Sequence, residues 1–372
     1  MKILVFSTNG AQRDGITAWI AATFTHMDQS GFETIDTIAF GDVSGSIVEQ
    51  FSAAGIRTHL LPSRRSKPLA YLRALRRLIR AHAYDVVHIN GNSATVAFDL
   101  IACASAGARA RIVHSHSTQT EHPSWHRILK PTMLMLCTDR VACGRDAGKW
   151  LFGERSFTVI SNGREFSNYS FNSDARHRIR HQLCVDNHHV LVGHVGNFNT
   201  EKNHRFLLEA FNQARLQAPH LRLCLVGDGA LRKELEEQIR QLDLQSSVTL
   251  VGLSPRVSDY LSAFDVNVLP STHEGLPGVI IESQISGLPS LVSESVTDEC
   301  ALTDLVEFIP INNPAVWVSR MACAIPSERL ISSQNAQALL KAAGYNLTDS
   351  ARQLRSLYLD IERRQNPRNS GT

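Results

Sequence analysis

Short runs of β-branched and other apolar residues recur along this chain, and segments of helix length separate them. Strands joined by helices pair in parallel through right-handed crossovers, and helices then cover both faces of the sheet. Seven such runs stand in the first part of the sequence, at residues 3–7, 33–40, 58–61, 86–89, 111–115, 140–142 and 158–160. We therefore expect an α/β fold, and a single small binding module is excluded.

The alternation stops at residues 164–189, a polar stretch rich in Asn, Ser, His and Arg, and then restarts. Five further strand-like runs follow at residues 190–195, 221–226, 248–251, 266–269 and 290–292. We expect two Rossmann-like parallel-sheet domains that face a cleft, residues 1–175 and 176–346. A C-terminal helix and tail, residues 347–372, should pack across a domain surface. Open sheets of this kind bind ligands beyond the carboxyl ends of their strands, so function is sought in the strand-to-helix loops.

The composition is that of a globular protein, with 43% apolar and 20% charged residues over 372 positions. The longest apolar stretches fall far short of the roughly 20 residues that cross a bilayer. The first residues look like a buried strand and not like the apolar core of a signal peptide. Seven cysteines include no CxxC pair, and sixteen histidines form no zinc-type cluster. We expect a cytoplasmic protein without a structural metal.

Charge is unevenly distributed along the chain. Residues 1–180 hold 22 Lys and Arg against 14 Asp and Glu, whereas the remainder holds 16 against 21. A basic half attracts an anionic partner, and nucleic acid, an anionic membrane surface and a phosphorylated substrate are all of this kind. Because no recognition motif or aromatic platform accompanies the charge, nucleic acid is not expected as a partner.

The glycine-containing loops do not match a dinucleotide site. Gly227 and Gly229 follow a predicted strand, but Arg232 occupies the third glycine position of G-x-G-x-x-G. The chain also has no G-x-x-x-x-G-K-[ST] sequence, which disfavours a P-loop nucleotidase. Turning the chain is one sufficient role for both glycines.

The most specific segment runs from Leu269 to Pro289 and contains two carboxylates, Glu274 and Glu282, eight positions apart. On a continuous helix they would lie about 12 Å apart, farther than the roughly 5–9.5 Å of a glycosidase pair, so a hydrolytic pair is not expected. Gly275 and Pro277 place Glu274 in a loop before a helix that carries Glu282. A ligand with a phosphate at this helix start and hydroxyl groups at both ends has the shape of a nucleotide sugar.

This segment resembles the E-x7-E motif of family 4 retaining glycosyltransferases of the GT-B fold. Stretches that look like further landmarks of that family lie at residues 86–90, 111–116, 159–163, 193–203 and 225–229, so the resemblance covers nearly the whole chain. Within the family, the chain looks most like enzymes that build bacterial exopolysaccharide or capsule. The resemblance implies transfer of a sugar from a nucleotide-sugar donor, with UDP as the default, to a glycan or lipid-linked acceptor.

The resemblance also implies roles for residues of the second domain. Glu274 would hold hydroxyl groups of the transferred sugar and Glu282 the ribose, while the backbone amides of Gly275 and Leu276 would contact the donor. Lys202 matches the lysine that binds the diphosphate in the family, and a cation there suits a departing phosphate. We expect Glu274 and Lys202 to be catalytic.

One position departs from the family pattern. Asn197 stands where the family usually has arginine, and an amide carries no charge to stabilise a diphosphate. Three explanations stay open: Arg205 substitutes from the next helix turn, the enzyme is slow, or the chain is a degenerate relative. Asn197, Arg205 and Gly227 complete the expected donor-binding residues.

The first domain contributes two candidates by the same resemblance. Gly15 resembles the glycine that lets the backbone approach the donor phosphates, and a plain turn residue is the alternative. His116 looks like the histidine that the family places near the reacting sugar, and we take it as catalytic; a buried structural histidine is the alternative. We place His114 on the opposite face of the strand.

The family retains the anomeric configuration of the sugar through front-face attack by the acceptor hydroxyl, which requires no enzyme nucleophile. Lys202 and helix N-termini would stabilise the leaving diphosphate. Since the chain has no Asp-x-Asp sequence, we expect metal-independent transfer with no cofactor.

Residues 63–80 place leucines at helical spacing beside several arginines, as in a basic amphipathic helix. Helices of this domain in the family often meet membranes that bear lipid-linked acceptors, so peripheral attachment to the inner face of the cell membrane is one interpretation. The other has the leucines facing the core and the arginines facing water.

Two functions besides sugar transfer stay open. A GT-B-fold nucleotide-sugar epimerase would convert the donor without an acceptor. A non-catalytic nucleotide-sugar binding protein would be compatible with Asn197 at the family's arginine position.

Overall fold

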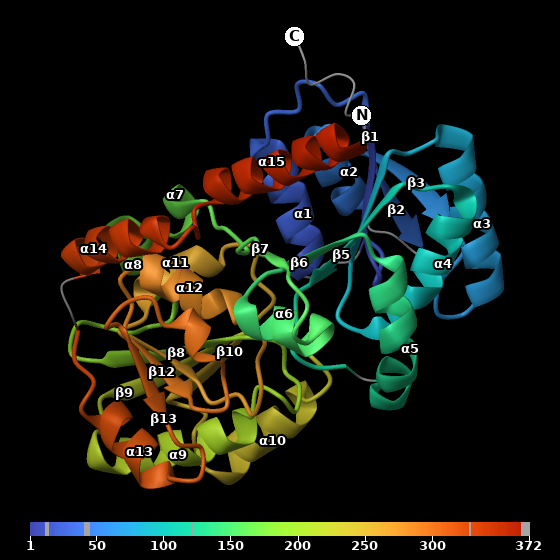
Figure 1. Cartoon of the computed structure of the whole chain (residues 1–372). Helices are drawn as coiled ribbons and strands as arrows, with labels where there is room; N and C mark the ends of the chain where they lie inside the picture. The colour runs from blue at the N-terminus through green and yellow to red at the C-terminus, as the bar shows by residue number, and fades with distance from the viewer. Residues whose placement is uncertain (12–14, 41–44, 121, 327–328, 366–372) are drawn as a thin grey trace. The chain divides into compact units, whose positions relative to one another are not determined.

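The computed structural model describes residues 1–11, 15–40, 45–120, 122–326 and 329–365, and Figure 1 shows its helices and strands. The chain forms two compact units. Unit 1 comprises Met1–Arg164 together with Gly344–Thr372, and unit 2 comprises Glu165–Ala343. Each unit is built around its own sheet, which confirms the α/β class and the repeated strand-helix alternation expected from the sequence.

Unit 1 contains a seven-stranded sheet in the order β3-β2-β1-β4-β5-β6-β7, and every strand pairing is parallel. The strands are β1 (Lys2–Ser7), β2 (Thr34–Phe40), β3 (Arg57–Leu61), β4 (Val86–Asn90), β5 (Ala110–Ser115), β6 (Asp139–Ala142) and β7 (Thr158–Val159). The helices are α1 (Gly15–His26), α2 (Gly45–Ala53), α3 (Pro68–His82), the 3-10 helix η1 (Ala94–Val96), α4 (Ala97–Ala106), α5 (Pro123–Leu136), α6 (Arg145–Phe152) and α15 (Leu347–Gln365).

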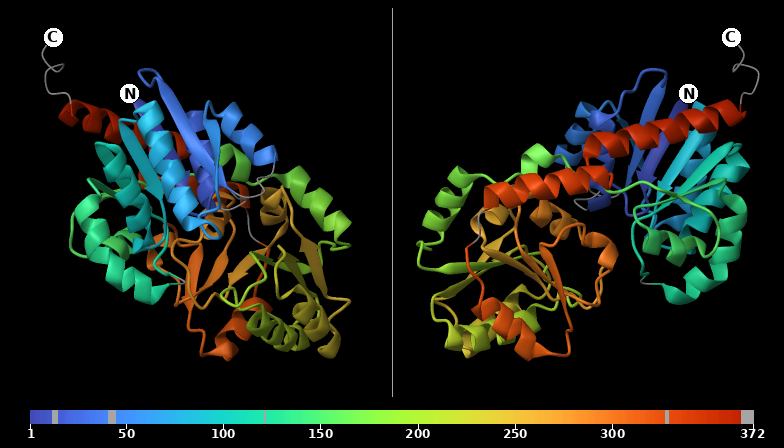
Figure 2. Two further views of the ribbon diagram at one scale, coloured as in Figure 1. Left: turned by 90° about the vertical axis from the view of Figure 1, so that its right-hand side faces the viewer. Right: turned by 60° about the vertical axis from the view of Figure 1, so that its left-hand side comes forward.

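The C-terminal helix α15 packs against α1 and completes the core of unit 1 (Figure 2). Leu354, Tyr358 and Ile361 lie on its buried side, in one apolar cluster with Trp19 and Phe24 of α1. The helix predicted from the last residues therefore covers the unit that begins with the first residues of the chain.

Helix α3 has the second of the two arrangements considered for residues 63–80. Tyr71, Leu75 and Ile79 are buried in unit 1, so the apolar side of the helix faces the core. Its exposed positions include four arginines: Arg73, Arg76, Arg77 and Arg80. The apolar side of α3 is consequently occupied by protein contacts.

Unit 2 contains a six-stranded parallel sheet in the order β10-β9-β8-β11-β12-β13. The strands are β8 (Val190–Val195), β9 (Leu221–Val226), β10 (Val248–Gly252), β11 (Val266–Leu269), β12 (Ser290–Ser293) and β13 (Val306–Ile309). The helices are α7 (Phe166–Tyr169), α8 (Ser173–Gln182), α9 (His204–Gln217), α10 (Arg232–Gln241), α11 (Val257–Ala263), α12 (Gly278–Ile285), the 3-10 helix η2 (Asp298–Cys300), α13 (Pro314–Ala322) and α14 (Arg329–Ala342).

The polar stretch at residues 164–189 contains the first junction between the units and also two helices, α7 and α8. Helix α8 turns polar side chains inward: Arg176 and Arg180 bind the two carboxylate oxygens of Asp265 at 2.5 and 2.9 Å. Asp265 is buried, and a buried carboxylate needs such partners. The helix is therefore held by ion pairs and not only by an apolar stripe.

Candidate functional site

Three loops of unit 2 leave the carboxyl ends of neighbouring strands. They follow β8 (residues 196–203), β9 (residues 227–231) and β11 (residues 270–277). Because these strands are parallel and adjacent in the sheet, the loops meet at one edge, where α/β sheets bind ligands. Most of the residues singled out from the sequence of the second domain lie in these loops.

Lys202 and Glu274 come together at this edge although they are 72 positions apart in the sequence. The Lys202 ammonium donates to Glu274 Oε1 at 2.5 Å, and the Ser271 hydroxyl donates to the same oxygen at 2.9 Å. Both charged side chains are mostly buried, with exposed fractions of 16% and 18%. The structure thus places beside each other the cation expected for the diphosphate and the carboxylate expected for the sugar.

The loops that carry this pair are fastened to each other through their backbones. The Thr272 N–H donates to the Glu201 carbonyl oxygen at 2.8 Å. Lys202 is fixed further by its own N–H, which donates to Asn199 Oδ1 at 3.1 Å. The relative position of lysine and carboxylate is therefore set by backbone contacts and does not depend on the side-chain ion pair alone.

Gly227 is required by the packing of the loop backbones. Its φ of +147° is one that other residues rarely adopt, and a Cβ at this position would lie 1.9 Å from the Gly196 carbonyl oxygen. The Gly196 N–H donates in turn to the Val226 carbonyl oxygen at 3.0 Å. This close approach accounts for the glycine, and a contact of Gly227 with the donor stays a prediction.

The residues of the E-x7-E segment divide between loop and helix as expected. Glu274 pairs with Val296 in an isolated parallel bridge, and Gly275 and Leu276 follow it, both half-buried. Pro277 is the N-cap of α12, one position before the first helical residue. Glu282 is half-buried on this helix, whose positive N-terminal end lies next to the Glu274 loop.

Asn197 and Arg205 lie in surroundings that differ from those of the mostly buried Lys202 side chain. Asn197 is exposed in the loop after β8. Arg205 lines a separate hollow between α9 and α10, together with Glu209 and Lys233. The predicted roles of Asn197 and Arg205 in donor binding stay predictions.

Two histidines that we did not single out lie close enough to Lys202 to feel its charge. His194 is buried, donates from Nδ1 to the Val268 carbonyl oxygen at 2.8 Å, and meets the His204 ring edge to face at a centroid distance of 4.6 Å. Burial, with the nearby Lys202 charge, lowers the pKa of His204 to about 4 and that of His194 well below its usual value. Both rings are therefore neutral supports for the lysine loop. In the sequence, the one indication of this role is that His204 directly follows Lys202 and Asn203.

His116 of unit 1 follows β5 and is oriented by a side-chain contact. Its Nε2 donates to Asn90 Oδ1 at 2.8 Å, and burial lowers its pKa to about 3. The expectation that His114 faces the other way is wrong, since the two rings stack with centroids 4.1 Å apart. Residues two apart on a strand share a face.

A relay of hydrogen bonds continues from this histidine stack into the core of unit 1. His114 Nδ1 lies 3.2 Å from His88 Nε2, and His88 Nδ1 lies 2.7 Å from the Tyr358 hydroxyl of α15. Burial lowers the pKa of His88 to about 3. The stack is thus a chain of neutral rings that ends on the C-terminal helix.

Gly15 is the first residue of α1, and a Cβ at this position would meet no atom within 4 Å. Its φ is not positive, so neither packing nor backbone conformation in unit 1 demands a glycine. Residues 12–14 of the same loop lie outside the described residues. The predicted contact of Gly15 with donor phosphates stays a prediction.

Metal-binding and membrane-spanning features were searched for over the residues that the structure describes. In that part of the chain, no three His, Cys, Asp or Glu side chains gather so that they could hold a metal ion. In the same part, no helix combines the length and the apolar character needed to cross a bilayer.

Comparison with known proteins agrees with this geometry. A family model described as glycosyl transferase 4-like domain matches residues 15–147, and one described as glycosyl transferases group 1 matches residues 189–323. The second match spans all the loops that carry Lys202 and Glu274.

The relatives cover most of the chain. EpsF of Bacillus subtilis (strain 168), whose name classes it with glycosyltransferases, is 30% identical over 343 residues, which is 88% of this chain and 89% of that protein. The UDP-Gal:alpha-D-GlcNAc-diphosphoundecaprenol alpha-1,3-galactosyltransferase of Escherichia coli is 25% identical and covers 79% of this chain and 80% of its own. Among solved structures, Anabaena HepE in complex with UDP-glucose has a TM-score of 0.77 at 19% identity, over 97% of this chain and 100% of that one.

Proposed function

Since this chain belongs to the group 1 glycosyl transferases and has their GT-B fold, we propose that it moves a sugar from a UDP-sugar to a glycan or lipid-linked acceptor in the synthesis of a bacterial surface polysaccharide. The chain is a glycosyltransferase, as the sequence predicted. The observation that carries the proposal is the Lys202–Glu274 pair at the carboxyl edge of the unit 2 sheet.

The nature of the donor and acceptor is supported by relatives. HepE, which shares the fold, binds UDP-glucose, and the Escherichia coli relative takes UDP-Gal and an acceptor linked to diphosphoundecaprenol. We extend a UDP-sugar and a lipid-linked glycan to this chain by analogy. With such an acceptor the protein would act in the cytoplasm, at the inner face of the cell membrane.

Lys202 and Glu274 would divide the donor between them. The ammonium of Lys202 would bind the diphosphate, where negative charge grows as the sugar departs, and the carboxylate of Glu274 would accept hydrogen bonds from sugar hydroxyls. The contact between the two side chains supports this assignment, because it brings together the cation and the carboxylate that the diphosphate and the sugar would each need. The hydrogen bond from Ser271 would keep Glu274 oriented if Lys202 turned toward phosphate.

We propose that transfer retains the anomeric configuration. The acceptor oxygen forms a bond to the anomeric carbon on the face that the diphosphate leaves, the bond between that carbon and the diphosphate oxygen breaks, and the departing UDP takes the acceptor proton. No covalent enzyme intermediate is needed. The cation and the positive end of α12 would stabilise the leaving group.

The other site residues enter as parts of the same proposal. Glu282 would bind the ribose, and the amides of Gly275 and Leu276 would contact the donor. Gly15 would allow close approach of the backbone to phosphate. His116 would contact the reacting sugar as a neutral hydrogen-bonding ring, which agrees with a pKa of about 3.

The test is release of UDP from a panel of UDP-sugars, measured with and without a polyprenyl-diphosphate-linked glycan. Release that depends on the acceptor, with an α-linked product from an α-linked donor by NMR, supports the proposal. Conversion of the nucleotide sugar without acceptor would identify an epimerase. Binding without turnover for every donor and acceptor tried would identify a non-catalytic binding protein. This alternative is compatible with an uncharged amide at Asn197.

A further inference from the structure

The Asn90 side chain, which binds His116, has a fixed orientation. Asn90 is the last residue of β4 and is fully buried. Its Nδ2 donates to the Phe6 carbonyl oxygen of β1 at 3.2 Å, and its Oδ1 lies 2.8 Å from His116 Nε2. Turning the amide over would bring Oδ1 against the Phe6 oxygen, and both of these atoms only accept hydrogen bonds. The amide therefore presents its oxygen to His116.

This orientation determines which nitrogen of His116 carries the proton. An amide oxygen cannot donate, so the hydrogen between Oδ1 and Nε2 belongs to the imidazole. Burial lowers the pKa of His116 to about 3, which leaves a neutral ring with a single N–H at neutral pH. Its titratable neighbours His114 and His88 are neutral for the same reason. Nδ1 of His116 consequently has a lone pair and can only accept a hydrogen bond.

This accepting atom has no hydrogen-bond partner among the residues that the structure describes. Nδ1 of His116 is buried, and so is Oδ1 of Asn162, which also has no partner there. Asn162 lies close enough to His116 for its amide to oppose the lowering of the pKa. Buried polar atoms are normally paired, and two acceptors require a donor. A group that binds beside these residues should therefore donate a hydrogen bond.

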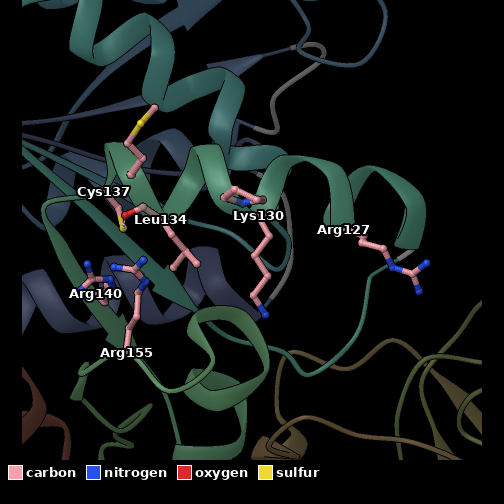
Figure 3. Close-up of a pocket in the computed structure, with 8 residues that line it drawn as sticks. Arg127, Lys130, Leu134, Cys137, Arg140 and Arg155 are labelled. Carbon is pink, nitrogen blue, oxygen red and sulfur yellow. Dashed lines mark hydrogen bonds between the residues drawn. The ribbon is translucent and has the colours of Figure 1, made fainter.

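The cations that could bind a negatively charged group in unit 1 gather elsewhere. A hollow of about 740 Å³ is lined by Arg127 and Lys130 of α5, by Arg140 and by Arg155 (Figure 3). It shares no residue with the surroundings of His116 described above, and no cation contacts His116 in the described part of the chain. A carboxylate or phosphate would need such a partner. An uncharged donor such as a hydroxyl group therefore suits Nδ1 better.

We propose that Asn90 is a positioning residue for sugar transfer: it keeps the proton of His116 on Nε2, so that Nδ1 accepts a hydrogen bond from a hydroxyl group of the transferred sugar. This inference rests on the proposed function, in which His116 contacts the reacting sugar. It adds the residue that sets the tautomer, the atom that binds and the chemical group that is bound. A sugar with hydrogen, an ether or a carboxylate in place of that hydroxyl offers no donor and should bind more weakly.

NMR of the full chain with 15N-labelled histidine tests the tautomer without any ligand. The signals of His116 are those lost in His116→Gln. We expect the proton on Nε2 in the wild type. In Asn90→Leu it should move to Nδ1, where Oδ1 of Asn162 can accept it. A proton on Nδ1 in the wild type, or an unchanged tautomer in Asn90→Leu, would overturn the inference.

Titration calorimetry with UDP, UDP-glucose and UDP-galactose tests the sugar contact. Asn90→Leu should weaken binding of the UDP-sugar that the wild type binds by about 5–150-fold, the range for a buried hydrogen bond left unmade. Its affinity for UDP alone should stay that of the wild type. Equal losses for UDP and the UDP-sugar, or a loss seen only in the KM of the acceptor, would contradict a contact with the transferred sugar.

Asn92→Leu is the matched control. Asn92 lies two positions farther along the chain, and its Oδ1 has no hydrogen-bond partner in the described structure. This variant loses the same amide and should keep the wild-type tautomer of His116 and the wild-type affinity for UDP-sugars. The same changes in Asn92→Leu as in Asn90→Leu would indicate a general disturbance and refute the specific role of Asn90.

The variant Asn90→Asp, of nearly the same shape, keeps the test decisive if Asn90→Leu does not fold. Its carboxylate still accepts from Nε2 but favours a second proton on the ring, so the pKa of His116 should rise. Below that raised pKa Nδ1 becomes a donor, and affinity for the UDP-sugar should fall with pH while affinity for UDP does not. A raised pKa by NMR without this fall would refute acceptance by Nδ1.

Analogues of UDP-glucose and UDP-galactose in which fluorine replaces one hydroxyl at a time identify the bound group. Fluorine cannot donate, so at one position the fluoro analogue should bind the wild type weakly and lose no further affinity in Asn90→Leu. Fluoro analogues that match the parent sugar at every position would refute the proposed hydroxyl contact.

Failure of this inference can be distinguished from failure of the proposed function. A wild type with the proton on Nε2 that binds no UDP-sugar would refute the proposed donor and with it the sugar contact. A wild type that transfers sugar but carries the proton on Nδ1 would refute the role of Asn90 alone.

Discussion

Replacing Lys202 by methionine should weaken UDP binding in a way that can be estimated from its contacts. A hydrogen bond from a charged group to phosphate contributes about 1.5–3 kcal/mol. In the free protein the ammonium is already held by Glu274, and loosening that mostly buried pair costs the wild type about 1 kcal/mol on UDP binding. The net loss in the variant is therefore about 0.5–2 kcal/mol, or about 2–30-fold in Kd.

Titration calorimetry of UDP into the wild type and Lys202→Met measures this directly. Lys233→Met is the matched control, because Lys233 is exposed on α10 and its loss changes the net charge equally. The variant Arg205→Met adds a third comparison and asks whether Arg205 compensates for Asn197. If Lys202→Met binds UDP within twofold of the wild type while remaining folded, the lysine is not a diphosphate ligand and the estimate above is refuted.

Further predictions concern catalysis, the departure from the family, packing and pH. Glu274→Ala should raise the barrier to transfer by about 2–4 kcal/mol, seen in kcat/KM, and near-normal turnover would remove this carboxylate from the active site. Asn197→Arg should preserve or tighten UDP binding in calorimetry, and a loss would show that Asn197 does not occupy the arginine role. Gly227→Ala should lower stability by about 2–4 kcal/mol in urea unfolding, because its Cβ would lie 1.9 Å from the Gly196 carbonyl oxygen. Burial lowers the pKa of His88 to about 3. As the pH falls below about 6.5, this histidine is therefore protonated in the unfolded chain while it stays neutral in the folded protein. Stability should then drop by about 1.4 kcal/mol per pH unit from this residue between pH 6.5 and 3, and the drop should be shallower in His88→Gln.

The parallel sheets could be predicted because their strands have a simple physical signature. A strand buried on both faces is a continuous apolar run, as at Val190–Val195, and such runs were found in the right order in both units. The proximity of Lys202 and Glu274 could also be inferred from the sequence, since loops at the carboxyl ends of adjacent parallel strands converge.

Elements that are held by polar contacts could not be predicted from apolar patterns in this way. Helix α8 lies in the stretch that looked like a linker, because its inward positions are Arg176 and Arg180 and their partner Asp265 is far away in the sequence. The short strand β13 and helices α13 and α14 also lie beyond the elements we expected. The histidine contacts could not be derived from spacing, since His194 meets His204, and His88 meets Tyr358, only through the tertiary fold.

The return of the C-terminal helix to unit 1 determines how this protein can be divided. Unit 2 is one uninterrupted insertion, Glu165–Ala343, so it can be excised with all strands of its sheet. A premature stop ahead of Gly344 would instead strip α15 from unit 1 and uncover Phe24 and its apolar neighbours. A fragment that ends at Arg164 should therefore aggregate. A stable unit 1 requires helix α15 to be fused to that fragment.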